Sequence, residues 1–445
     1  MATTLTAAIP AQERLARSER LAPAALLEKQ LAQLAALVVH AYANVPFYRA
    51  RLDAAGIVPG AQIELDQWRR LALLTRREVQ GSGTALHALR LPQREGRVLE
   101  TSSSGSTGIP VTVLGTDREA LVFKILSLRN HLWHRRDFAR KIGVINSLSF
   151  PNARRREGFR QARWGDGEAL PFETGPAAFL DISNPVARQI EWLEAERPAY
   201  LITYPSNLAA ILAAYEAAGR GSPGVIEVIS QGEVLPDEVR EQCLRVWNAT
   251  IQDGYSAQEV GVMALQCPDH LHYHVQSEAV LLELIDEDGK PVPEGGIGRV
   301  VVTPLYNHAM PLLRYEIGDY AQSGPPCPCG RTLPVLTRIM GRARNMLVTP
   351  DGNRYWPTIG SRRFREIAPV VQHQIVQTRP DRLEIRLVAE RALTDDETAK
   401  LERHIRGSLP YPFEIAIRPM AEIPRQPNSK FEYFRSEIAA RVDGV

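Results

Sequence analysis

Residues 101–108 form an unbroken run of serine, threonine and glycine, and Ile109 and Pro110 follow it. Such a loop has little side-chain bulk, so its backbone N–H groups can converge on a charged oxygen while its hydroxyls add donors. The same composition suits a flexible linker. The strand-like run at 111–114 follows at once, however, and this favours a phosphate-binding loop. No Gly-Lys-Ser/Thr follows the glycines, so it is not a Walker loop.

Three further segments carry residue types that suit a nucleotide and an acid. In the run 254–259, Tyr255 stands beside a glycine and could flank a flat ring, while Glu259 could bind Mg²⁺ together with phosphate oxygens. Asp319 directly follows a glycine turn, a position that suits the paired hydroxyls of a ribose. Lys430 ends a loop rich in proline and polar residues, from which a point charge could reach a carboxylate or a phosphate. Taken alone, each is also compatible with an ordinary loop or surface residue.

Two short segments are rich in metal-ligating side chains. The first contains Cys267 and three alternating histidines, His270, His272 and His274; the second is Cys327-Pro-Cys329-Gly330. Three thiolates and one imidazole would make a closed tetrahedral zinc site, which is structural rather than catalytic. The alternative is a cysteine-rich surface turn with spare histidines. The spacing is not that of a standard zinc finger and does not decide which histidine binds.

Composition limits the broad class of protein. The chain has 445 residues, so we expect two or three domains. Its 44% hydrophobic and 23% charged residues are ordinary for a soluble globular enzyme. Its net charge of +2 gives no overall electrostatic field that would attract nucleic acid or a membrane. No run approaches a membrane span and no signal peptide is evident, so we expect a cytoplasmic protein. The arginines at 154–156, 160 and 163 favour a solvated face over contact with a phosphorylated co-substrate.

Hydrophobic periodicity predicts the elements that position these segments. Helices are expected at about 21–56 and 118–132. Strand-like runs at 141–146, 199–204 and 225–230, with a helix at 207–215 between the last two, indicate a doubly wound α/β layer.

From residue 279 onward, the sequence favours antiparallel strands and then a separate C-terminal domain. Antiparallel strands are expected at 279–286 and 298–303, around a turn at 287–289. The last hundred residues are predicted to form a separate small domain with a helix across a sheet. Its expected elements are strands at 370–376, 382–388 and 413–417 and a helix at 395–409.

The order of these motifs resembles that of the adenylate-forming superfamily, and within it the phenylacetate–CoA ligase branch. The Ser/Gly loop is similar to the family's T-S-G-S-T-G-K-P loop, 255–259 to Y-G-x-T-E, and 315–319 to Y-x-T-G-D. Residues 341–342 are similar to the G-R hinge segment and 424–430 to the P-R-T-x-x-G-K loop. The resemblance implies a large N-terminal domain at 1–342, built of doubly wound sheets with a β-rich subdomain, and a small mobile α+β domain at 343–445.

The resemblance also implies a role for each matching residue. Glu259 and Lys430 would be catalytic, the first holding Mg²⁺ and the second bridging the substrate carboxylate and the α-phosphate. Arg344 would sit at the hinge about which the small domain rotates. The residues that would bind ATP or AMP are Ser103, Ser104, Gly105, Ser106, Thr107, Gly108, Gly232, Glu233, Asp253, Gly254, Tyr255, Asp319 and Arg342. Those that would line the acyl pocket are Tyr204, Ser206, Asn207 and Ser230.

Relatives in this branch carry similar Cys…His…Cys-x-Cys segments, which favours zinc held by Cys267, His274, Cys327 and Cys329. The chain also departs from the family pattern. Ile109 stands where lysine is common, Ser256 and Gln258 where glycine and threonine are usual, and Ser429 where glycine precedes the C-terminal lysine. None of these departures removes Glu259, Asp319 or Lys430.

The implied activity is ATP-dependent conversion of a carboxylic acid, aryl or arylacetic, to an acyl-adenylate and then to a coenzyme A thioester. One alternative acceptor is a carrier-protein thiol or an amine. A second alternative is a nucleotide-binding relative that has lost turnover. The resemblance further implies a homodimer.

Overall fold

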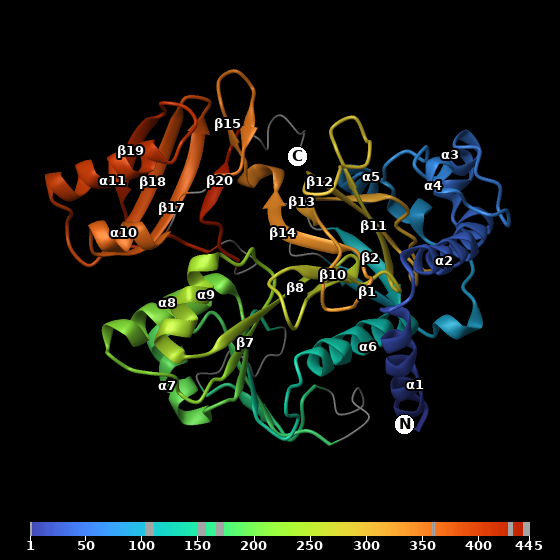
Figure 1. The fold of residues 1–445 in the computed structure, drawn as a ribbon, viewed down its shortest axis with the longest axis horizontal. Coiled ribbons are helices and arrows are strands. Elements are labelled where there is room, and N and C mark those ends of the chain that lie inside the picture. Colours follow the sequence, from blue (N-terminus) through green and yellow to red (C-terminus); the bar gives the residue numbers. More distant parts are fainter. Residues whose placement is uncertain are drawn as a thin grey trace. The chain divides into compact units, whose positions relative to one another are not determined.

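The computed structural model describes residues 2–102, 111–148, 157–165, 173–357, 359, 361–425 and 430–438. The chain divides into two compact units, each assembled from separate stretches of sequence (Figure 1). The first unit comprises Met1–Arg140, Gln161–Ala177 and Asp253–Ile339, and the second comprises Lys141–Arg160, Ala178–Gln252 and Met340–Val445. The domain boundary at 342/343 stays a prediction.

The first unit contains a mainly antiparallel sheet with the strand order β11-β12-β13-β14-β10-β9-β8. Its strands are β8 (Thr250–Ala257), β9 (Gly261–Gln266), β10 (Tyr273–Val275), β11 (Val280–Ile285), β12 (Ile297–Pro304), β13 (Tyr315–Gly324) and β14 (Val335–Arg342). The predicted strands at 279–286 and 298–303 are β11 and β12, and they pair antiparallel. The prediction of a β-rich subdomain is thus confirmed.

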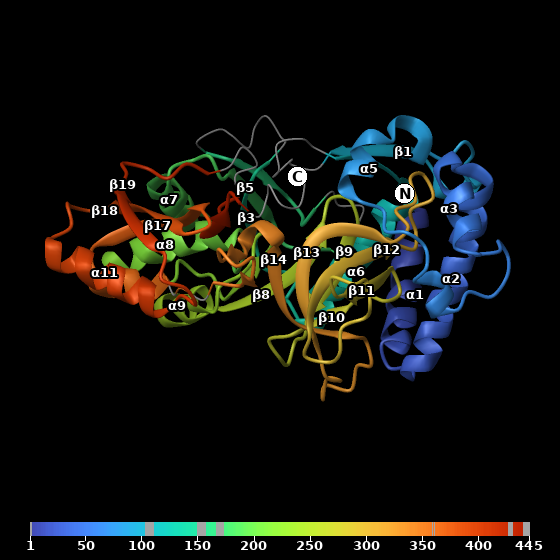
Figure 2. The same cartoon turned by 90° about the horizontal axis from the view of Figure 1, so that it is seen from above.

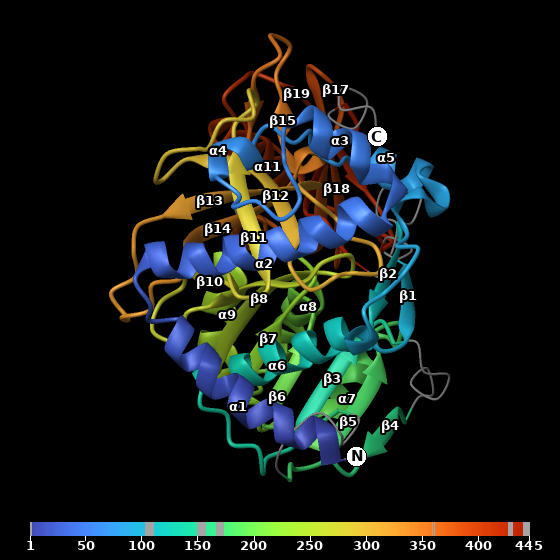
Figure 3. The same cartoon turned by 90° about the vertical axis from the view of Figure 1, so that its right-hand side faces the viewer.

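Helices cover this sheet. The main ones are α1 (Ala2–Ser18), α2 (Pro23–Asn44) and α6 (Asp117–Trp133), with shorter turns at η1 (Pro46–Tyr48), α3 (Arg49–Ala54), α4 (Leu65–Trp68), α5 (Arg76–Gly81), η2 (Gly83–Leu86) and η3 (Gln93–Glu95). α2 lies across β11 and β12 (Figure 3), and Gln30 Nε2 donates to the Val280 carbonyl at 2.7 Å. No helix in the described part of the chain is long and apolar enough to cross a membrane.

The stretch 21–56, predicted to be helical, consists of α2, the 3₁₀ turn η1 and α3. α2 ends at Asn44, and Val45 is extended, with φ −116° and ψ 105°. The residue before a proline is pushed out of the helical region, so Pro46 forces this break. The chain resumes as a 3₁₀ turn and then the short helix α3, both of which pack into the main core. The helix expected at 118–132 is observed as α6, with Thr116 as its N-cap.

A buried arginine fixes the start of β13. Arg314 is 3% exposed and has a left-handed backbone, with φ 50°. Its guanidinium donates to the carbonyls of Arg69 and Leu71 at 2.5 and 2.7 Å and pairs with Glu283 at 3.1 Å. The backbone also connects the two segments, because the Leu74 N–H donates to the Arg314 carbonyl at 2.9 Å. The segment before α5 is thereby tied to the strand that carries Asp319.

The second unit contains the predicted α/β layer. The strand order includes β7-β6-β3-β5, and β7, β6 and β3 pair parallel. These strands are β3 (Ile142–Asn146), β5 (Ala177–Asp181), β6 (Tyr200–Thr203) and β7 (Glu227–Ser230), and β4 (Phe159–Gln161) is the neighbour of β5. Helix α7 (Val186–Glu196) connects β5 to β6, α8 (Pro205–Ala217) connects β6 to β7, and α9 (Asp237–Trp247) follows β7. The three predicted strands and the helix at 207–215 are therefore confirmed. Cys243 is fully buried on α9, as expected of a core thiol.

The C-terminal part of this unit has its own sheet, with the order β19-β18-β17-β20. Its elements are β15 (Leu347–Val348), β16 (Arg354–Tyr355), α10 (Ser361–Ile367), β17 (Val370–Arg379), β18 (Arg382–Ala389), α11 (Asp395–Gly407), β19 (Glu414–Pro419) and β20 (Phe434–Ser436). A separate apolar cluster that includes Phe364, Leu401 and Phe413 joins the helices to the sheet. The predicted small α+β region is observed here (Figure 2).

Replacing Arg314 with methionine should destabilise the fold by about 3–5 kcal/mol, because Glu283 would lose its ion-pair partner and the carbonyls of Arg69 and Leu71 would lose their donor. Urea unfolding measures this change. Arg69→Met is the matched control, since its pair with Asp66 is exposed and should contribute less than about 1 kcal/mol. Equal unfolding midpoints for the two variants would contradict the role given to Arg314.

Candidate active site and metal centre

The predicted phosphate loop, Ser103 to Gly108, lies outside the described residues. Its two flanks are β1 (Val98–Ser102) and β2 (Thr112–Thr116), which pair antiparallel and end in register at Ser102 and Thr112. Their hydroxyls are 2.9 Å apart. The loop therefore connects the two strands of a hairpin, and its contacts with phosphate stay a prediction.

Two predicted nucleotide residues meet in the first unit. Tyr255 lies on β8 and Asp319 on β13, and the Tyr255 hydroxyl donates to Asp319 Oδ2 at 2.9 Å. Tyr255 is buried, whereas Asp319 is half-buried and follows Gly318, whose φ of 85° sets a turn that favours glycine. This hydrogen bond orients the Asp319 carboxylate.

Asp253 and Gly254 precede Tyr255 on the same strand. This strand, β8, continues to Ala257. Asp253 is buried; its N–H donates to Gln266 Oε1 at 3.0 Å, and its Oδ2 accepts from the Tyr273 hydroxyl at 2.6 Å. These bonds align β8 with its neighbours and so support Tyr255.

Glu259, the predicted magnesium ligand, lies in the turn between β8 and β9. Its side chain is 5% exposed and pairs with Arg76 Nη1 at 3.2 Å. Arg76 is the first residue of α5, a helix whose N-terminus is closed by a capping box between Thr75 and Glu78. Arg76 is not predicted from the sequence, because 183 residues separate it from Glu259 and no local pattern links the two.

In the second unit a buried carboxylate organises the predicted acyl region. Glu233 accepts from the Ser206 N–H and hydroxyl, both at 3.0 Å, and from the Phe431 N–H at 2.7 Å. Burial raises the pKa of Glu233, and these donors together with Arg425, 3.8 Å away, oppose that rise. Arg425 also donates to the Ser206 hydroxyl at 2.7 Å.

These contacts bring the C-terminal loop to the end of β7. Lys430 precedes Phe431, and its Cε lies 3.6 Å from where a Cβ on Gly232 would stand. The Tyr204 ring lies 3.0 Å from the same point, and Gly232 has φ 80°, so only glycine fits between the ring and the lysine. The structure thus brings Lys430, Gly232, Glu233, Tyr204 and Ser206 together.

The other two predicted acyl residues differ in their environment. Asn207 is buried, and its amide donates to Gln189 Oε1 at 2.7 Å and to Thr203 Oγ1 at 3.1 Å, so its donors hold α8 against its neighbours. Ser230 is 2% exposed, and among the described residues its hydroxyl has no hydrogen-bond partner.

The predicted hinge is tied to the segment after Lys430. Arg344 donates to Glu432 from Nε at 2.9 Å and from Nη2 at 2.7 Å. The Arg342 N–H donates to Asn345 Oδ1 at 2.9 Å, and Asn345 Nδ2 reaches the Phe434 carbonyl at 2.9 Å. Movement at the hinge would therefore be transmitted directly to the residues that follow Lys430.

The four predicted zinc ligands meet in the first unit. The ligand atoms of Cys267, His274, Cys327 and Cys329 all lie within 4.8 Å of one another. Cys267 Sγ and Cys327 Sγ are 3.8 Å apart, and Cys329 Sγ is 3.5 Å from His274 Nε2. Of the three histidines left open by spacing, His274 is the one in this group. Burial lowers its pKa to about 4, which keeps the ring neutral, as a metal ligand must be.

A charged network supports this cluster. Arg331 Nη1 lies 3.5 Å from Cys329 Sγ, its Nε pairs with Glu19 at 3.2 Å, and its guanidinium lies over the Trp133 ring. Glu19 also pairs with the buried Arg129 at 2.9 Å. The cluster is thus linked to α6 and to the end of α1.

No protein-family profile matches the chain. It is 26% identical over 442 residues to a phenylacetate–coenzyme A ligase of Thermus thermophilus, covering 91% of this chain and 94% of that one. It is 25% identical over 351 residues to the Escherichia coli enzyme of the same name, covering 76% of each. A crystal structure of 2-hydroxyisobutyryl-CoA ligase in its postadenylation state has the same fold, with a TM-score of 0.75, 18% identity, and coverage of 96% and 93%.

The end-to-end match in sequence, the shared fold and the order of the motif residues lead to one conclusion. The chain belongs to the adenylate-forming superfamily, in its phenylacetate–CoA ligase-like branch.

Proposed function

We propose that this protein is an AMP-forming acid–CoA ligase that activates an aryl or arylacetic acid. The observation that carries the proposal is the docking of the C-terminal loop on Glu233, which brings Lys430 beside Gly232 and Tyr204. The relatives named phenylacetate–coenzyme A ligase support coenzyme A as the acceptor and an arylacetic acid as the substrate class.

The first half-reaction joins two anions. The substrate carboxylate attacks the α-phosphorus of ATP, the acyl–phosphate bond forms, and pyrophosphate leaves. Positioning and charge neutralisation supply most of the catalysis in such a step. Lys430 would place its ammonium between the carboxylate and the α-phosphate, while Asp319, oriented by Tyr255, would accept from the ribose hydroxyls.

Glu259 offers an oxygen donor of the kind that Mg²⁺ takes in nucleotide sites, and the ion when bound would neutralise phosphate charge. Arg76 holds this carboxylate in place by its ion pair. In the second half-reaction the thiol of coenzyme A attacks the acyl carbon and AMP leaves, after the small domain has turned about Arg344. A homodimer, a carrier-protein acceptor and a cytoplasmic location stay predictions.

ATP–pyrophosphate exchange tests the activity. With Mg²⁺ and no coenzyme A, we expect exchange to depend on an aryl or arylacetic acid, and addition of coenzyme A should then give AMP and a thioester. Aliphatic acids and amino acids serve as comparison substrates. Absence of exchange with every acid, in protein that binds ATP, would contradict the proposal.

Lys430→Ala should lower acid-dependent exchange about 100-fold or more, because one charged group at the reacting phosphate is lost. Thiolation of a supplied acyl-adenylate should be spared, since Lys430 acts only in the first step. Lys400→Ala is the matched control: Lys400 lies on α11 and pairs with Asp396 on the surface. Equal losses in both half-reactions would refute this assignment.

We further propose that Cys267, His274, Cys327 and Cys329 hold a structural zinc ion. The donor set is that of a closed tetrahedral site. Burial raises the pKa of the Cys327 thiol, so three thiols packed here favour a bound cation that stabilises them as thiolates.

Metal analysis of the purified protein should then find about one zinc per chain. Cys327→Ser should lose the metal and lower the melting temperature, because binding of a structural zinc contributes to folding stability. His272→Ala should keep both, since His272 is outside the ligand group. Full zinc content in Cys327→Ser would exclude this site.

A further inference from the structure

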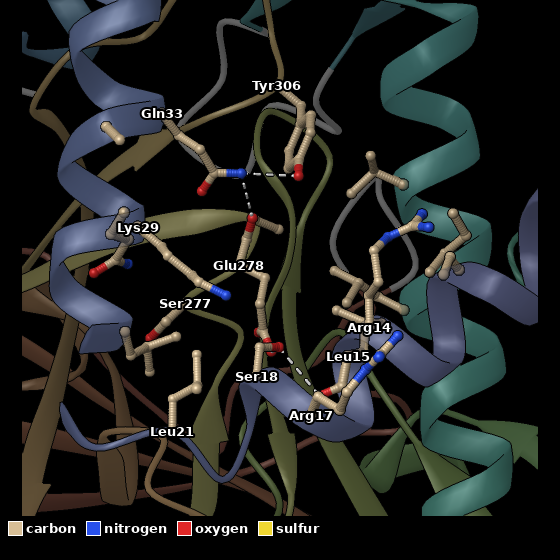
Figure 4. A pocket seen from close by; sticks show the side chains of 18 of the residues that line it. Arg14, Leu15, Arg17, Ser18, Leu21, Lys29, Gln33, Ser277, Glu278 and Tyr306 are labelled. Atoms are coloured by element: carbon tan, nitrogen blue, oxygen red, sulfur yellow. Dashed lines mark hydrogen bonds between the residues drawn. The ribbon is translucent and has the colours of Figure 1, made fainter.

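A cavity of about 900 Å³ lies in the first unit between α1, α2 and α6, and its lining includes none of the residues assigned above to nucleotide, acid and zinc (Figure 4). α1 and α6 form one side and α2 the other, while residues 277–279 form part of its wall. Its volume falls within the range of pockets that hold a small molecule.

The wall of this cavity is aliphatic. Five of its side chains remain only half-buried although their neighbours are packed: Leu15, Leu21, Leu121, Val122 and Ile125. Apolar surface left open in a concave site is characteristic of a ligand-binding groove, since a chain laid there would remove it from water.

Four cations border the aliphatic wall: Arg14, Arg17, Lys29 and Arg118. Arg118 is already paired, with Glu95 at 2.9 Å and over the Tyr306 ring. Arg14 and Lys29 are exposed, and among the described residues neither has an ion-pair partner. Lys29 reaches from α2 into the space between the helices (Figure 4).

The one acid in the lining does not cancel this charge. Glu278 accepts from Arg129 at 3.0 Å through each of its oxygens and from the Ser18 hydroxyl at 2.5 Å. Its charge is therefore neutralised by Arg129, a residue outside the lining. Farther along the wall, the Tyr306 hydroxyl accepts from Gln33 at 2.9 Å and can still donate.

We propose that this cavity binds an amphipathic anion with a linear aliphatic chain and one anionic head group, a long-chain carboxylate. The chain would lie along Leu15, Val122 and Ile125, and the head group would meet Arg14 and Lys29. A long-chain acyl thioester presents the same chain with a different anionic head, so the free acid and the thioester are two sources of this chemistry. A flat aryl acid would leave most of the aliphatic wall uncovered.

Isothermal titration with dodecanoate tests the proposal on the full chain without any measurement of activity. Dodecanoate should bind, whereas butyrate and dodecanol should bind more than tenfold more weakly, because one lacks the chain and the other the charge. Dodecanoyl-CoA forms a second arm. Tighter binding of the thioester, through the same residues, supports the site and identifies its source.

Two pairs of variants locate the binding. Val122→Trp places a larger side chain in the cavity and should abolish dodecanoate binding. Leu132→Trp, on the same helix but outside the lining, should leave binding unchanged. The double variant Arg14→Glu/Lys29→Glu should weaken dodecanoate binding at least tenfold. Lys400→Glu/Arg403→Glu makes the same change in net charge on α11 and should have no effect. Because Arg14 and Lys29 are exposed, their double variant should fold, and it tests the proposal even if Val122→Trp does not fold.

Three results would overturn the proposal. The first is dodecanoate binding that is unchanged by the charge-reversed and wall-filling variants. The second is binding that responds to Tyr204→Ala alone, which would place the acid in the predicted acyl region. The third is a concentration-dependent dimer that Val122→Trp dissociates, with no dodecanoate binding in either state, because a second copy of the chain would then cover the groove.

Discussion

The contact between Glu233 and the backbone of Phe431 is the interaction on which the proposed chemistry depends. A buried carboxylate is costly unless donors surround it, and Glu233 has three at 3.0 Å or less. Two come from the start of α8 and the third from the chain just after Lys430. The carboxylate therefore completes its hydrogen bonding only when the C-terminal loop is docked, and docking is what delivers the lysine.

The strength of this contact also suits a domain that must move. A hydrogen bond to a charged group contributes roughly 1.5–3 kcal/mol, so one such bond can be broken and remade without a large barrier. The ion pair between Arg344 and Glu432 connects the predicted hinge to the same loop, so we expect the lysine and the hinge to move together. The proposed exit of Lys430 in the second half-reaction requires the loss of the Phe431 bond and of the Arg425 contacts with Ser206 and Glu233, and not the unfolding of the domain.

Many of the strands and the Cys/His cluster could be predicted from the sequence, because the patterns that indicate them are local. Alternating apolar runs located the strands at 141–146, 199–204 and 382–388, and the paired Cys and His segments located the cluster at 267–329. The break within the predicted helical stretch 21–56 has an equally physical cause. It comes after Asn44 and follows from Pro46, whose effect the helical spacing of the leucines does not show.

The residues that sequence reasoning missed are those whose partners are remote. Arg76 meets Glu259 only because the segment before α5 is hydrogen-bonded to β13, and Arg314 holds that segment in turn. Nothing within a few residues of Arg76 distinguishes it from a solvated surface arginine. Similarly, the cavity beside α1 depends on how three helices pack, which no periodicity encodes.

Three of the predicted site carboxylates, two in the first unit and one in the second, share a property: each has its partner within its own unit. Glu259 has Arg76, Asp319 has the Tyr255 hydroxyl, and Glu233 has Arg425 and three closer donors. Each carboxylate is thus compensated, so no uncompensated buried charge has to be tolerated in the free protein. If Mg²⁺ and ATP bind as proposed, they would replace partners that these carboxylates already have in the folded protein. Arg76, whose ion pair at 3.2 Å holds the Glu259 side chain, is thus a positioning residue for the proposed reaction.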